Sequence, residues 1–144
     1  MEKTWILVAN AAEARLLEAI NQKSLKELKS LNHEASRLKE SELLSDTAGR
    51  AFDSAGQGRH AMGTKVDAKE HEHIKFAEKL SHTIEDARTK HGVKKLYVVA
   101  GPDFLGLLRK KISADSQKII AAELDKDLTH EKPQKIREAL PFML

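Results

Sequence analysis

The segment LYVVAGPDFLGLL, residues 96–108, contains the signals that decide the fold. Its first five residues, Leu96 to Ala100, form an unbroken apolar run whose length is typical of a buried strand. Gly101 and Pro102 follow at once, and the fixed φ of proline favours the first turn of a helix. The apolar side of that predicted helix consists of Phe104, Leu105, Leu107, Leu108 and Ile112.

Helices and strands alternate on both sides of this segment. Residues 67–91 carry apolar or small side chains at helical spacing, and Gly92 stands where a helix-ending glycine belongs. Residues 118–124 are predicted to form a further strand, and Pro133 opens a short closing helix that Pro141 ends. This order is a βα alternation, which favours parallel strand pairing and right-handed crossovers.

The N-terminal third has a different pattern. The apolar run from Trp5 to Ala9 predicts a buried strand, and a turn around Asn10 follows it. Residues 14–20 fit a strand or a helix equally well. Leucines at 25, 28 and 31 are spaced by three, which is closer to a helix than to a strand.

Residues 33–66 are predicted to form a long mobile loop, because they are rich in turn formers and poor in large apolar side chains. A short helix over 36–44 fits part of it. Four glycines, at 49, 56, 58 and 63, allow close backbone approach to a partner. The donors in this loop are Gln57 and the cationic or imidazole side chains of Arg50, Arg59 and His60, which suit phosphate or carboxylate. The alternative is a polar loop with no role.

Composition excludes several function classes. There is no cysteine, and hence no disulfide, thiolate metal site or cysteine nucleophile. No apolar stretch approaches the length of a membrane span, and no signal peptide is recognisable, so we expect a cytoplasmic protein without a membrane partner. The net charge is +3, and residues 93–144 hold ten basic and seven acidic side chains. Within them Arg109, Lys110 and Lys111 form either a solvated face or a patch for RNA or another polyanion.

Motifs for catalysis or metal binding are incomplete. His71 and His73 lie on opposite sides of a helix, and the His-Glu-x-x-His spacing is absent. No P-loop, nucleophile elbow or dinucleotide fingerprint occurs. A metal-dependent nuclease using Asp46, Asp53 and Glu123 has only the acidity of these residues in its favour. We therefore expect no metal and no cofactor.

Several stretches together resemble the bacterial host-attachment-protein family. They are residues 5–15, 45–54, 76–80, 99–109 and 123–129, and they span almost the whole chain. The family in turn looks like a relative of the middle domain of archaeal and eukaryotic peptide-release factors, whose long loop carries a Gly-Gly-Gln motif. Here that place reads Ala55-Gly56-Gln57, with alanine in place of the first glycine.

The resemblance implies both a fold and a function. The fold is a single α/β domain over residues 1–144, with a mixed sheet of about five strands flanked by helices. An N-terminal antiparallel meander that includes residues 24–31 precedes a βαβα half. The function is that of a ribosome- or tRNA-associated factor, in which Gly56 and Gln57 act in catalysis while Arg50, Arg59, His60, Lys110 and Lys111 contact RNA. The alternative is a non-enzymatic module whose loop orders on binding a protein partner, and enzymatic activity and oligomeric state both stay open.

Overall fold

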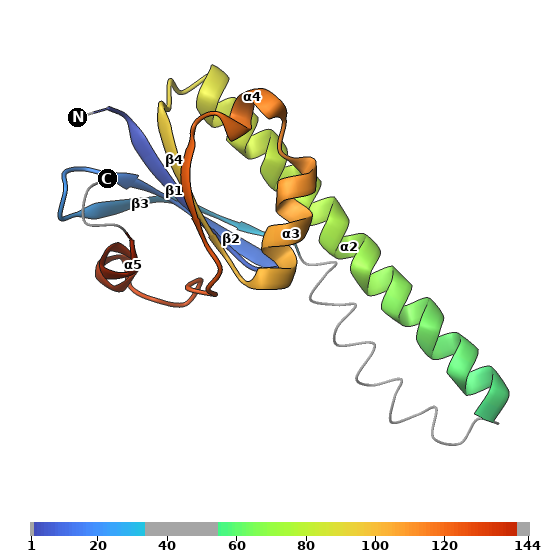
Figure 1. Ribbon diagram of the computed structural model, residues 1–144. Coiled ribbons are helices and arrows are strands. Elements are labelled where there is room, and N and C mark those ends of the chain that lie inside the picture. Colours follow the sequence, from blue (N-terminus) through green and yellow to red (C-terminus); the bar gives the residue numbers. More distant parts are fainter. Residues whose placement is uncertain (1, 34–54, 141–144) are drawn as a thin grey trace.

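The computed structural model describes residues 2–33 and 55–140, with side chains described from residue 68 onward in the second range. One sheet contains five strands in the order β3-β2-β1-β4-β5 (Figure 1). The strands are β1 (Thr4–Ala9), β2 (Glu13–Ala19), β3 (Leu25–Asn32), β4 (Lys95–Ala100) and β5 (Ile120–Leu124). The helices are α2 (Ala55–Thr89), α3 (Pro102–Lys111), α4 (Ala114–Gln117) and α5 (Pro133–Ala139).

Strand pairing confirms the predicted mixed sheet. β1 runs antiparallel to β2, and β2 runs antiparallel to β3, which gives the N-terminal meander. β1 pairs in parallel with β4, and β4 pairs in parallel with β5. The carboxyl ends of β1, β4 and β5 therefore meet at one edge of the sheet.

Helices cover both faces of the sheet. On one face α2 and α3 pack through Phe76, Leu80 and Leu108 against alternate residues of β1, β2 and β4. On the other face Ile136 of α5 packs with Ile6 and the remaining alternate residues (Figure 1). All of β1, and β4 from Leu96 onward, are buried, because strands covered on both sides expose neither set of side chains. This explains why both strands are continuous apolar runs in the sequence.

β3 is a strand despite the helical spacing of its leucines. Leu16 pairs with Lys29, and Leu17 pairs with Glu27, so Leu28 is an extra residue in a bulge. The bulge shifts the side-chain alternation by one residue, so Leu25 packs against the core on one face of the sheet and Leu31 against the core on the other. The third strand implied by the family resemblance is thus confirmed.

The long helix is the main correction to the sequence analysis. α2 begins at Ala55, not near residue 67, so residues 55–66 belong to a helix of 35 residues and not to an irregular loop. Three glycines in residues 56–63 disfavour a helix by about 1 kcal/mol each, which is why the sequence predicted a loop. Residues 34–54, including the suggested helix over 36–44, lie outside the described residues.

The C-terminal half agrees with prediction apart from one short element. Gly92 has φ +68°, as predicted for a helix-ending glycine. Pro102 and Pro133 each open a helix. The predicted strand over 118–124 begins two residues later, at Ile120, because α4 precedes it with Ser113 as its N-cap. Pro141, the expected stop of α5, lies outside the described residues.

Candidate functional site

Polar side chains gather at the carboxyl edge of the parallel strands, where ligands bind in many open α/β sheets. Asn10 follows β1, and Asp127 and Thr129 follow β5. Arg15 projects from β2 toward the same segment and donates to the carbonyl oxygen of Thr129 at 3.0 Å. We call Asn10, Arg15, Asp127 and Thr129 the carboxyl-edge cluster.

Asn10 uses both ends of its amide. Its Oδ1 accepts hydrogen bonds from the backbone N–H groups of Ala12 and Glu13, each at 2.9 Å, which closes the β1–β2 turn. Its Nδ2 then donates to the hydroxyl of Thr129 at 3.1 Å. One side chain thus both shapes a local turn and holds a loop that is 119 residues away in sequence.

Asp127 and Thr129 form the other half of the cluster. The Asp127 carboxylate accepts hydrogen bonds from the Thr129 backbone N–H, at 3.1 Å, and from the Thr129 hydroxyl. Burial alone would raise the pKa of Asp127, but these bonds from Thr129, helped by Asn10, outweigh it and lower the pKa below its ordinary value. The carboxylate is therefore ionised and engaged.

Arg15 completes the connections. Its guanidinium also donates to the carbonyl oxygen of Glu131 and pairs with the Glu27 carboxylate on β3. Strands β2 and β3 are thereby joined to the segment that follows β5. Because every member of the cluster is engaged with another protein group, the cluster holds loops in place and offers no free nucleophile or base.

A second connection joins the strand ends to α2. His33, just after β3, lies 3.1 Å from the Glu72 carboxylate of α2, and its ring stacks on Phe76 with centroids 5.4 Å apart. The hydrogen bond from His33, more than the nearby Lys75, lowers the pKa of Glu72. Within the described residues no three histidine or acidic side chains are placed to hold a metal ion.

The structure places the predicted site residues in two regions. Gly56, Gln57, Arg59 and His60 lie in the first turns of α2, and their side chains are outside the described part of the structure. Arg50 lies outside the described residues altogether. Gly56, Gln57, Arg59 and His60 therefore share the N-terminal end of α2, and Gln57 lies about 32 Å along that helix from Glu78, the residue that Lys111 contacts.

The basic run ends α3, where the helix dipole favours cations. Arg109 Nε contacts both carboxylate oxygens of Glu123, at 2.9 and 3.1 Å, and Lys111 lies 3.3 Å from the Glu78 carboxylate. Lys110 is exposed. Glu123, one of the three suggested metal ligands, is thus engaged by a cation, and the other two, Asp46 and Asp53, lie outside the described residues.

Sequence reasoning missed the carboxyl-edge cluster as a unit. Asn10, Arg15, Asp127 and Thr129 all lie in segments that carried the family resemblance, but nothing in the sequence shows that the first and last of these segments touch. The parallel pairing of β1 with β4 and of β4 with β5 brings them together.

Comparison with protein-family models identifies a family for this chain. A family model described as "Protein required for attachment to host cells" matches residues 5–140, nearly the whole chain. A search of curated proteins finds no match. Among the described residues, no helix combines the length and apolar character that crossing a bilayer requires.

Proposed function

The chain belongs to the family of proteins required for attachment to host cells, and from this premise we propose that it is a ribosome- or tRNA-associated factor. The working end in this proposal is the start of α2, with Gly56 and Gln57. The family description refers to attachment to host cells, which is a biological outcome. The proposal concerns a molecular activity, namely contact with the ribosome or with tRNA.

The length of α2 is the observation that carries the proposal. Its first buried core residue in the described part is Phe76. Gln57 lies 19 residues earlier, which corresponds to about 28 Å along the axis of a helix. The N-terminal part of α2 extends away from the sheet in Figure 1. A projecting helix of this kind suits a protein that must reach into a narrow site on a large partner.

The chemistry at the end of the arm favours a role in acyl transfer. The first four backbone N–H groups of a helix have no partner within it, and the N–H of Gln57 is among them in α2. By analogy with release factors, such an N–H stabilises the oxyanion that forms when water attacks the ester of peptidyl-tRNA. Arg50, Arg59 and His60 are the proposed phosphate contacts, and Lys110 and Lys111 form a second, separate basic contact.

Sedimentation and a hydrolysis assay test the proposal. The protein should sediment with ribosomes at low salt and dissociate as salt rises, because phosphate contacts are salt-dependent. Gln57→Pro removes the backbone N–H and is tolerated in the first turn of a helix, so it should lower peptidyl-tRNA hydrolysis by about a hundredfold, the size of effect seen when an oxyanion donor is lost. Gln57→Ala, which keeps the backbone N–H, is the matched control. Lack of ribosome association at every salt concentration would refute the proposal, and hydrolysis equal in both variants would remove the catalytic role.

A protein-interaction module is the second candidate. It is favoured by the carboxyl-edge cluster, whose polar groups are engaged with one another and leave no complete catalytic set among the described side chains. Affinity capture with the full chain and with a variant lacking residues 46–63 separates the two candidates. A partner protein lost on deletion supports the module, whereas an unchanged set of captured proteins contradicts it.

A further inference from the structure

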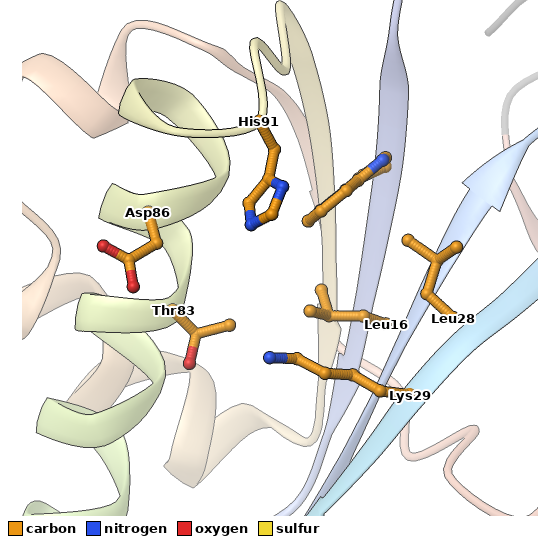
Figure 2. A pocket seen from close by; sticks show the side chains of 7 residues that line it. Leu16, Leu28, Lys29, Thr83, Asp86 and His91 are labelled. Atoms are coloured by element: carbon orange, nitrogen blue, oxygen red, sulfur yellow. The ribbon is translucent and has the colours of Figure 1, made fainter.

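A pocket of about 330 Å³ lies between the C-terminal part of α2 and strands β1, β2 and β3. Figure 2 shows side chains from the helix on one side and from the strands on the other. Asp86, one of its lining residues, is 29 residues from Gln57, or about 43 Å along α2. The pocket is therefore remote from the proposed working end and calls for its own explanation.

The interior of the pocket is aromatic and aliphatic. Trp5 is held in place by a hydrogen bond from its Nε1 to the Glu18 carboxylate at 3.1 Å. The His91 ring lies 5.3 Å from the Trp5 ring, tilted by 34°. Leu16 and Leu28 form the strand side of the pocket, and Leu28 is 38% exposed. These surfaces suit a flat ring, which packs against aromatic and aliphatic groups together.

Two opposite charges face the pocket from opposite sides. Lys29 extends from β3 toward α2 in Figure 2, and it makes no ion pair with any side chain that the structure describes. Asp86 stands on the α2 side, where its partner is Lys90 at 3.4 Å. Both members of that pair are more than half exposed, so the pair contributes little and Asp86 can exchange it for a ligand.

Thr83 adds an apolar contact. Its hydroxyl donates to the carbonyl oxygen of Lys79 at 3.2 Å, which leaves its methyl group for the pocket. Beside the polar His91 ring, Lys29 and Asp86 are therefore the lining side chains that supply opposite charges for recognition. A volume near the lower end of the range for small-molecule sites, which is about 300–1,000 Å³, selects a compact ligand.

We propose that this pocket binds a small, flat aromatic acid that also carries a hydrogen-bond donor. The acid group pairs with the Lys29 ammonium, the donor pairs with the Asp86 carboxylate, and the ring lies against Trp5 and the leucines. Two charged contacts at opposite ends of one ring fix the orientation of the ligand as well as its class.

Calorimetry with 4-aminobenzoate tests this inference, because that molecule has a carboxylate and an amine at opposite ends of one ring. Trp5 is the only tryptophan in the chain, so its fluorescence reports binding at this pocket independently. Benzoate, which lacks the donor, and aniline, which lacks the acid, are the comparison ligands. The test variants are Lys29→Gln and Asp86→Asn. The matched controls are Lys26→Gln on the same strand and Asp115→Asn on α4, both exposed and outside the pocket.

We expect 4-aminobenzoate to bind the wild-type protein and to change Trp5 emission, and each test variant to weaken binding about tenfold while the controls do not. Thermal unfolding of every variant checks that the fold is intact. The inference is overturned if 4-aminobenzoate does not bind at millimolar concentration. It is equally overturned if aniline binds as tightly, or if Lys29→Gln binds no more weakly than Lys26→Gln.

Discussion

Replacing Asn10 with alanine should lower the free energy of unfolding by about 3 kcal/mol. The side chain makes three hydrogen bonds, two to the backbone of its own turn and one to Thr129. Each such bond contributes about 1 kcal/mol net in a folded protein. The bond to Thr129 ties together the first and last strands of the parallel set, so its loss also frees the segment that follows β5. Urea unfolding of wild type and variant measures the difference, with the same slope of unfolding free energy against urea concentration used for both.

Asn21 provides the matched control. Its Oδ1 accepts from the backbone N–H groups of Lys23 and Ser24, at 2.8 and 2.9 Å, so it makes the same local turn without a long-range bond. Asn21 is exposed and lacks the third, long-range bond, so its replacement by alanine should cost at most about 2 kcal/mol.

A double-mutant cycle of Asn10→Ala with Thr129→Val isolates the long-range bond, and we expect a coupling of about 1 kcal/mol. The reasoning fails if Asn10→Ala and Asn21→Ala are equally destabilising. It also fails if the cycle shows no coupling, because the carboxyl-edge cluster would then contribute nothing beyond its local turns.

Three further predictions concern pH, glycine and the core. The lowered pKa values of Asp127 and Glu72 mean that their stabilisation is complete above the unfolded values of about 4 and is lost as the pH falls through the folded values. A double variant with Asp127→Asn and Glu72→Gln should therefore show a flatter fall of melting temperature between about pH 7 and about pH 3 than wild type. Gly92→Ala should destabilise the protein by about 1–2 kcal/mol because the φ of Gly92 is +68°. Gly106→Ala, inside α3 with open space around it, should stabilise the protein by about 0.5–1 kcal/mol. Chemical denaturation measures the two opposite changes in the free energy of unfolding. Phe76→Ala, fully buried and stacked on Phe104 at 5.9 Å, should cost about 3–5 kcal/mol in the same assay, and a smaller loss would contradict its place in the core.

The parts of the fold that sequence predicted are those with strong local signals. β1 and β4 are recognisable because burial on both faces makes them apolar throughout. α3 has a proline at its start, and α2 has a glycine after its end. β3 could not be derived from periodicity, because the bulge at Leu28 disrupts the alternation on which such a prediction depends.

Other features depend on contacts between distant segments. α4 is a four-residue helix, and it is held to α2 by hydrogen bonds from Ser113 and Ser116 to the Glu85 carboxylate, at 2.8 and 2.6 Å. No local pattern predicts such an element. The pocket beside Trp5 was missed for the same reason. Its lining residues come from β1, β2, β3 and α2, and from His91, which follows α2.

The bulge in β3 also bears on how the protein behaves at high concentration. β3 is an outer strand of the described sheet. Outer strands with regular, apolar edges tend to form hydrogen-bonded pairs with the outer strands of other molecules. Here an irregular backbone is combined with the charged side chains Lys26, Glu27 and Lys29, which are exposed. Intermolecular strand pairing at this edge would have to match a kinked register and would place charged side chains at the new interface. The same irregularity that hid the strand from sequence reasoning thus protects the folded protein against fibrous assembly.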